Sequence, residues 1–207
     1  MSPPGVRLVV ASRNRGKVEE VRRLLSQLGL EVRSLDEAGV APGLELPEPH
    51  ETFAENALSK ARALQGLLGG WALGDDSGLE VDALGGAPGV RSARFAGVEG
   101  AGRDAANNAK LLQALQGIEA RRRTARFVCC LALVGPSSEL LTARGTCEGV
   151  ILESPRGQTG FGYDPLFLPA GCTLTMAELG LDEKNRLSHR GQALQRLYQA
   201  LRARLGP

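Results

Sequence analysis

Near the start of the chain, a continuous run of apolar residues is followed by a segment in which apolar residues recur every three or four positions. The β-branched run from Val6 to Ser12 predicts a buried strand. Val18 and Val21 begin an apolar helical face, and Gly29 follows where helices commonly end. Residues 30–35 (LEVRSL) then predict a second strand. A strand, loop, helix and strand in this order predict an α/β fold with at least one parallel strand pair.

The rest of the chain shows the same two periodicities. Residues 38–51 are rich in Pro, Gly and Glu and predict a loop. The elements expected after this loop are a helix over about 52–68, a strand, a break and a short strand over 71–84, a helix over 104–115, a central strand over 124–135, its hairpin partner over 140–152, and a last helix that starts near Ser188. Because a hairpin adds an antiparallel pair, we expect a mixed β-sheet with helices.

The composition is that of an ordinary globular protein, with 43% hydrophobic and 23% charged residues among 207. A net charge of +2 and an aromatic content of 4% argue against nucleic acid or an anionic membrane as the partner. No apolar run approaches the ~18–20 residues of a membrane span, and residues 1–17 lack the order of a signal peptide. The four cysteines form no C-x-x-C pair, which argues against structural zinc and for a reduced, cytoplasmic protein.

Ser12–Lys17 (SRNRGK) joins the first predicted strand to the first predicted helix. Backbone N–H groups and the positive end of a helix favour an anion at such a position, and Lys17 adds a formal charge. The segment predicts a phosphate-binding loop. A solvated turn with ordinary surface cations is the alternative.

Asp75 and Asp76 stand side by side between an apolar run and Ser77-Gly78. Two adjacent carboxylates repel each other, so their pairing requires compensation. Mg2+ prefers oxygen ligands and usually takes one or two carboxylates together with phosphate oxygens. With Glu48 and Glu55 as candidate neighbours, the pair predicts a magnesium site. An acidic turn is the alternative.

Two further segments contain groups suited to a nucleobase. In Gly160–Pro165 (GFGYDP), Phe161 and Tyr163 offer rings for stacking and Asp164 offers hydrogen-bond acceptors. In Lys184–Leu194 (KNRLSHRGQAL), cations fall in the first turn of the last helix, where they oppose the helix dipole unless a ligand compensates them. An inward-packed loop and a solvated helix end are the alternatives. All four segments together predict a nucleoside triphosphate site.

Five colinear segments resemble the inosine triphosphate pyrophosphatases, which hydrolyse dITP, ITP and XTP to the monophosphate and pyrophosphate. The segments are SRNRGK (12–17), TFAENALSKA (52–61), DDSGLEVDALGGAPGVRSARFAG (75–97), GFGYDPLF (160–167) and SHRGQAL (188–194). The resemblance implies an α/β fold with an elongated mixed β-sheet flanked by helices, in two lobes with a central cleft. It also implies one domain over 1–207, a homodimer, purine nucleoside triphosphate substrates and a role in cleaning the nucleotide pool.

The resemblance further implies roles for single residues. Asp76 would activate water with Asp75 beside it, and Asp76 and Glu48 would hold Mg2+. The substrate-binding residues that it implies are Ser12, Arg13, Asn14, Arg15, Gly16, Lys17 and Lys60 for the triphosphate, Ser77 within the site, and Phe161, Gly162, Tyr163, Asp164, Lys184, His189 and Arg190 around the base. The family commonly reads Glu-Thr-Gly-x-Thr-Phe where this chain reads Glu-Pro-His-Glu-Thr-Phe, so Glu51 remains an alternative metal ligand.

The expected reaction is in-line attack of water on the α-phosphorus, with magnesium pyrophosphate as the leaving group. A donor such as His189, Arg190 or Lys184 would form a hydrogen bond with the C6 carbonyl of hypoxanthine and xanthine. The amine of adenine would leave this donor unpaired. Because xanthine has an oxygen and guanine an amine at position 2, the site must prefer an acceptor there.

Three other functions fit parts of the sequence. A pyrophosphatase for pyrimidine or modified nucleotides would more commonly open with Ser-x-Ser-Pro-Arg-Arg. A nucleotide-sensing module without turnover would not need the paired aspartates, and a purely structural domain would not need five colinear segments. A turnover assay separates these alternatives.

Overall fold

The computed structural model describes residues 7–137 and 139–205, which form two compact units. Of the described residues, the first unit contains those up to Asp76, those within Cys129–Gly145 and those from Arg190 onward. The second contains Ser77–Val128 and Thr146–His189. Val6, which the sequence assigned to the first strand, lies outside the described residues. The chain passes from one unit to the other within long strands and at the start of the last helix.

The sheet has six strands in the order β2-β1-β3-β4-β5-β6. Their bounds are β1 Arg7–Val10, β2 Glu31–Arg33, β3 Trp71–Val81, β4 Thr124–Val134, β5 Leu140–Ile151 and β6 Phe167–Pro169. Strand β1 pairs in parallel with β2 and with β3, whereas β5 pairs antiparallel with β6. The predicted α/β class with a mixed sheet is confirmed.

Five α-helices lie in the described ranges: α1 Arg15–Leu25, α2 Phe53–Leu68, α3 Arg103–Ala114, α4 Leu181–Leu187 and α5 His189–Leu205. Short 3-10 turns cover Ser26–Leu28, Asp82–Leu84, Gly89–Arg94, Gly100–Gly102 and Ala120–Arg122. None of these helices has the length and apolar character needed to cross a membrane. The sequence missed α4, which ends immediately before Ser188, but it found the start of α5.

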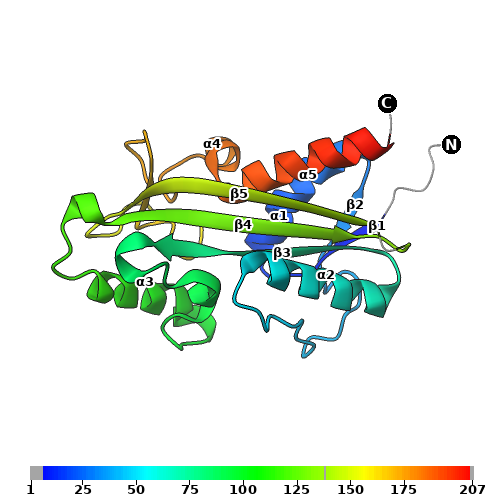
Figure 1. Cartoon of the computed structure of the whole chain (residues 1–207), viewed down its shortest axis with the longest axis horizontal. Coiled ribbons are helices and arrows are strands. Elements are labelled where there is room, and N and C mark those ends of the chain that lie inside the picture. Colours follow the sequence, from blue (N-terminus) through cyan, green and yellow to red (C-terminus); the bar gives the residue numbers. More distant parts are fainter. Residues whose placement is uncertain (1–6, 138, 206–207) are drawn as a thin grey trace. The chain divides into compact units, whose positions relative to one another are not determined.

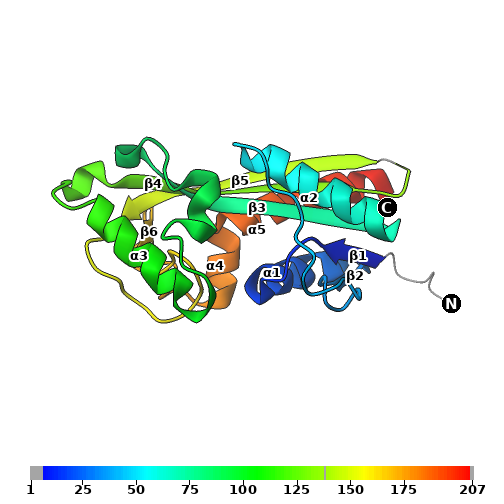
Figure 2. The same cartoon turned by 90° about the horizontal axis from the view of Figure 1, so that it is seen from below.

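In the first unit, alternate residues of β1 face opposite sides of the sheet. Leu8 and Val10 pack in one apolar cluster with α1 and α5. Val9 and Ala11 pack in another, which includes Leu64 of α2. Figures 1 and 2 show α2 on the other side of these strands from α1 and α5. The period-two alternation of the strand therefore places both faces of this unit's sheet under helices.

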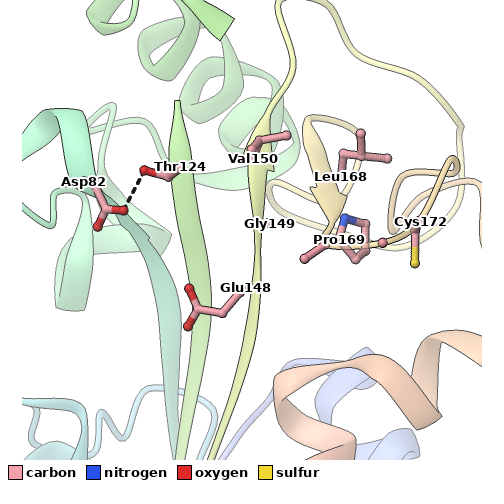
Figure 3. Close-up of a pocket in the computed structure, with 10 residues that line it drawn as sticks. Asp82, Thr124, Glu148, Gly149, Val150, Leu168, Pro169 and Cys172 are labelled. Atoms are coloured by element: carbon pink, nitrogen blue, oxygen red, sulfur yellow. Dashed lines mark hydrogen bonds between the residues drawn. The ribbon is translucent and has the colours of Figure 1, made fainter. Parts of the chain in front are cut away.

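In the second unit, one face of the strands is covered and the other carries a groove. Leu111 of α3 and Leu115, which follows the helix, are fully buried against strand residues that include Leu79 and Phe127. A pocket of about 550 Å³ is lined by Asp82, Thr124, Glu148, Gly149, Val150, Leu168, Pro169, Ala170, Gly171 and Cys172 (Figure 3). None of these ten residues is a predicted site residue.

The predicted break at the paired aspartates is wrong. Strand β3 runs without interruption from Trp71 to Val81 and contains Asp75 and Asp76, which are 1% and 7% exposed. Because side chains alternate along a strand, the two carboxylates point to opposite faces of the sheet. Their repulsion is thereby reduced, and each side chain meets its own set of partners.

Gly74, directly before the aspartates, lets β3 approach helix α2 closely. A Cβ atom at this position would lie 1.9 Å from the carbonyl oxygen of Ala57 and 3.0 Å from the backbone nitrogen of Ala61. No side chain fits between the strand and the helix backbone. The absence of a side chain at Gly74 therefore sets the separation at which α2 can reach the neighbouring Asp76.

We expect Gly74→Ala to destabilise the protein by about 1–3 kcal/mol, because the added methyl group forces β3 and α2 apart. Urea unfolding followed by circular dichroism measures the change. Gly66→Ala is the matched control, since Gly66 is exposed on the same helix and has open space around it. This control should stabilise by about 0.5–1 kcal/mol through helix propensity. Equal effects of the two substitutions would contradict the close-approach argument.

Candidate active site

The segment Ser12–Lys17 forms the turn into helix α1. The Asn14 side chain caps the helix by accepting the Lys17 backbone N–H at 3.2 Å, and the Ser12 hydroxyl accepts the Asn14 N–H at 3.1 Å. No acidic residue lies in the first turn, so the positive helix end is left for an anion. Arg13 is directed elsewhere: it donates to Asp36 and to the carbonyl of Ala41, and thereby anchors a neighbouring loop.

Asp75 is completely buried and lies between two cations. Lys17 Nζ and Arg190 Nε each lie 2.7 Å from one of its carboxylate oxygens. Arg190 also donates to Glu20 of α1 at 2.7 Å, and the Cys129 thiol contacts Asp75 at 3.7 Å. Strand β3, helix α1 and helix α5 are thus joined by one buried chain of charges.

The cations decide the ionisation of Asp75. Burial acts to raise its pKa, but Arg190 and Lys17 outweigh burial and hold the pKa well below its ordinary value. Asp75 is therefore a fixed anion with little affinity for a proton. The sequence grouped Arg190 with residues around the base, whereas the structure places its guanidinium against Asp75 and Glu20, with only 1% of the residue exposed.

Asp76 lies in a different environment, against helix α2. Lys60 Nζ donates to its Oδ1 at 3.0 Å and Asn56 Nδ2 to its Oδ2 at 3.2 Å. Lys60 also binds Glu48 at 2.8 Å. Burial raises the pKa of Asp76, and Lys60 offsets this effect only in part. A carboxylate with raised proton affinity is suited to accept a proton, which distinguishes Asp76 chemically from its neighbour.

Glu48 and Asp76 fit a magnesium ion that shares its coordination with phosphate. Their carboxylates already converge on one cation, the Lys60 ammonium group. Over the described residues, three or more His, Cys, Asp or Glu side chains are nowhere gathered as a metal site. Mg2+ usually takes one or two carboxylates and completes its shell with water and phosphate.

Glu51, the alternative ligand, is exposed just before α2, whereas Glu48 reaches Lys60. Glu55 is engaged at the start of α2, where the Thr52 hydroxyl accepts its backbone N–H and donates to its carboxylate.

The second unit gathers most of the residues expected around the base. Lys184 Nζ lies 2.6 Å from Asp164 Oδ2 and 4.9 Å from the centre of the Phe161 ring. Asp164 also accepts the backbone N–H of Phe161 at 3.0 Å. A Cβ atom at Gly160 would lie 2.2 Å from Asp164 Oδ2, so this contact requires glycine. The group offers one cation, one anion and one aromatic face.

Helix α3 holds this loop through two residues that the sequence did not indicate. Asp104 accepts the Gly162 N–H at 2.7 Å, and Asn108, one turn later, donates to the Gly162 carbonyl at 2.9 Å. One face of α3 thus binds both the backbone N–H and the backbone carbonyl of Gly162. The only signal in the sequence was the i,i+4 spacing of two polar residues, which also occurs on solvated helix faces.

Tyr163 and His189 take part in packing. The Tyr163 ring is buried, its hydroxyl donates to the Ser92 carbonyl at 2.9 Å, and burial raises the pKa of this hydroxyl. The loop thus adopts the inward-packed alternative at Tyr163. His189 stacks on Phe127, with ring centres 4.8 Å apart and an interplanar angle of 16°. Ser77 is partly buried in β3.

The predicted residues therefore form two groups, one in each unit. The group in the first unit consists of two sets of ion pairs that meet at adjacent residues of β3, namely Lys17, Asp75 and Arg190, and Glu48, Lys60 and Asp76. The group in the second contains Phe161, Gly162, Asp164 and Lys184. At the start of α1, Arg15 is exposed and Gly16 is partly buried. The first group has the chemistry of a phosphate and metal site, and the second that of a base site.

The chain belongs to the Ham1 family, whose model matches residues 8–200. Among its relatives is a protein of Exiguobacterium sibiricum named dITP/XTP pyrophosphatase, 53% identical over 97% of this chain and the whole of the relative. A Bacillus subtilis protein of the same name is 47% identical over 94% of this chain and 96% of its own.

Solved structures show the same fold. A HAM1 protein from Coxiella burnetii superposes with a TM-score of 0.83 and 41% identity, covering 95% of this chain and 98% of its own. A nucleoside-triphosphatase / dITP/XTP pyrophosphatase from Mycobacterium abscessus gives a TM-score of 0.75 and 46% identity, over 95% of this chain and the whole of the other. The expected fold class and family are confirmed.

We expect Arg190→Met to destabilise the protein by about 3–5 kcal/mol, because it leaves the buried charges of Asp75 and Glu20 without their shared cation. Denaturant unfolding measures the loss. Arg126→Met is the control: Arg126 pairs with Glu80, Asp82 and Glu148 on a partly exposed surface, where removal should cost about 1 kcal/mol or less. If the two losses were similar, Asp75 would not depend on Arg190.

Proposed function

We propose that the chain is a nucleoside triphosphate pyrophosphatase that hydrolyses non-standard purine nucleotides, namely dITP, ITP and XTP, to the monophosphate and pyrophosphate. The observation that carries the proposal is the convergence of Glu48 and Asp76 on the Lys60 ammonium group, at distances of 2.8 and 3.0 Å. Hydrolysis of a metal-bound triphosphate needs carboxylates that hold a cation and a lysine that can bind a phosphate group. The names of the relatives support the choice of substrate.

In this proposal the first unit binds the triphosphate. The N-terminus of α1 and Lys17 bind phosphate oxygens, with Asn14 keeping the helix end in place. Mg2+, held by Glu48 and Asp76, would neutralise charge on the leaving pyrophosphate. Asp76 orients the attacking water and takes its proton. Asp75 remains ionised and holds Lys17 in place.

The second unit binds the base. Lys184 donates to the C6 carbonyl that hypoxanthine and xanthine share, while Asp164 and Phe161 hold its ammonium group. Adenine has an amine at C6 and would leave one N–H of this ammonium group without an acceptor, which costs about 1–3 kcal/mol for a buried group. We also propose that His189, at the start of α5, belongs to the base site, with its ring orientation set by stacking on Phe127.

Three accompanying features belong to the same proposal: Mg2+ dependence, a homodimer and a place in the cytoplasm. All four cysteines are free thiols, three of them buried, which supports a reducing compartment. Sedimentation equilibrium of the purified protein tests the homodimer through its mass.

The test of the function is release of pyrophosphate by the purified protein from dITP, XTP, dGTP, dATP and dTTP, each with Mg2+ and with a chelator. We expect Mg2+-dependent release from dITP and XTP, and far less from the other three. Release mainly from dTTP would favour a pyrimidine-directed enzyme. The absence of release from every nucleotide by folded protein would favour a binding module.

We expect Asp76→Asn to lower kcat for dITP by about 10²–10⁴-fold, because the amide cannot take the proton of the attacking water. KM should change only a few-fold, since the contacts to phosphate through Lys17 remain. Steady-state kinetics checks both values. Asp82→Asn serves as control, because Asp82 lies in the groove of the second unit, outside the predicted site. Near-normal turnover of the Asp76 variant would exclude it as the base.

A further inference from the structure

Helix α2 presents two hydrogen-bond donors, one turn apart, to the two oxygens of a single carboxylate. Lys60 donates to Asp76 Oδ1 at 3.0 Å, and Asn56 donates to Asp76 Oδ2 at 3.2 Å. The resemblance accounted for Lys60 and assigned no role to Asn56. Asn56 is 1% exposed, so its amide is buried together with the carboxylate that it contacts.

Asn56 also binds both polar groups of the His50 backbone. Its Oδ1 accepts the His50 N–H at 2.9 Å, and its Nδ2 donates to the His50 carbonyl at 3.1 Å. His50 lies two residues after Glu48, whose carboxylate binds Lys60. One turn of α2 therefore fixes Asp76 and, at the same time, the loop that brings Glu48 beside it.

Both N–H groups and the carbonyl oxygen of the Asn56 side chain are used in this arrangement. A carboxamide has two N–H donors and one carbonyl acceptor, and here the donors serve Asp76 and His50 while the acceptor serves His50. A carboxylate at this position could not donate, and a smaller side chain would not reach. Among uncharged side chains of this size, an amide meets all three requirements.

We propose that Asn56 is a positioning residue for the hydrolysis described above, and this inference rests on the proposed function. The terminal torsion of an aspartate is broad, so a single partner leaves the carboxylate plane free to turn. Donors on both oxygens fix that plane. Asn56 thus sets the direction in which Asp76 offers its lone pairs to water and metal, and it keeps Glu48 within reach of the same cation.

A purely structural role for Asn56 is the competing explanation, and Asn107 provides a matched control for it. Asn107 is 2% exposed on helix α3 and makes three bonds of the same kind. It accepts the Ala96 N–H at 2.7 Å and donates to the carbonyls of Ser92 and Ala93 at 3.2 Å. It therefore clamps a loop to a helix as Asn56 does, but its donors serve backbone carbonyls and not a carboxylate.

The experiment compares Asn56→Ala and Asn107→Ala in the full chain, with kcat and KM for dITP and the thermal midpoint of each. We expect both variants to lose thermal stability. Asn56→Ala should also lower kcat by about 30–100-fold with KM within about 3-fold, because a small misplacement of a reacting group costs rate rather than binding. Asn107→Ala should keep kcat within about 3-fold of the unchanged protein.

A direct titration with Mn2+, without nucleotide, gives a second readout. Loosening Asp76 and the Glu48 loop should weaken Mn2+ binding by about 10-fold or more in Asn56→Ala and leave it unchanged in Asn107→Ala. Asn56→Asp, which preserves size and the acceptor but cannot donate to Asp76, serves if the alanine variant does not fold, and its kcat should fall similarly.

The outcomes separate this inference from the function on which it rests. If the protein without substitutions releases no pyrophosphate from dITP, the result counts against the proposed function, and the Mn2+ titration then decides the role of Asn56. If that protein is active and Asn56→Ala keeps kcat within about 3-fold, the positioning role is wrong. It is equally wrong if Asn107→Ala loses as much kcat as Asn56→Ala.

Discussion

The burial of the Asp75 charge is the constraint on which the first unit depends. An ionised carboxylate without access to water is tolerated only where cations and hydrogen bonds replace its hydration. Lys17 and Arg190 supply this replacement at 2.7 Å each, from helices at opposite ends of the chain. The helix ends that frame the candidate site are therefore fixed by a single anion, and Glu20 balances the remaining charge on Arg190.

The alternation of side chains along β3 then gives two neighbouring carboxylates different chemistry. Asp75 faces the side of α1 and α5, where cations keep it ionised. Asp76 faces α2, where burial raises its pKa and donors from Asn56 and Lys60 hold both oxygens. The absence of a side chain at Gly74 makes this second contact possible, because it brings the strand against the helix backbone. A carboxylate that cations keep ionised and a carboxylate with a raised pKa are thus adjacent in sequence.

Local patterns were enough to predict most elements but not the route of β3. The apolar spacing found α1, α2, α3 and α5 to within a few residues, and the strand-like runs found β1, β2, β4, β5 and the two ends of β3, but not the three-residue strand β6. The paired aspartates suggested a break because an isolated sequence offers no partners for them. Helix α4 was missed because its segment is short and largely polar, with a fixed position that depends on the packing of Leu187 and the contact of Lys184 with Asp164.

The sequence by itself determined the fold class, the family resemblance and the chemical kinds of group present, since these follow from periodicity and from residues at short spacings. Only the tertiary structure decided which groups meet. Arg190 binds Asp75, which lies 115 positions away in sequence. Arg13 binds a neighbouring loop, and Tyr163 packs in the core. Asn56 binds Asp76, and Asp104 and Asn108 bind Gly162, although the sequence indicated none of these three residues. The physical reason is that burial and hydrogen-bond partners are properties of the packed chain. A side chain's charge state and role follow from them and not from its neighbours in sequence.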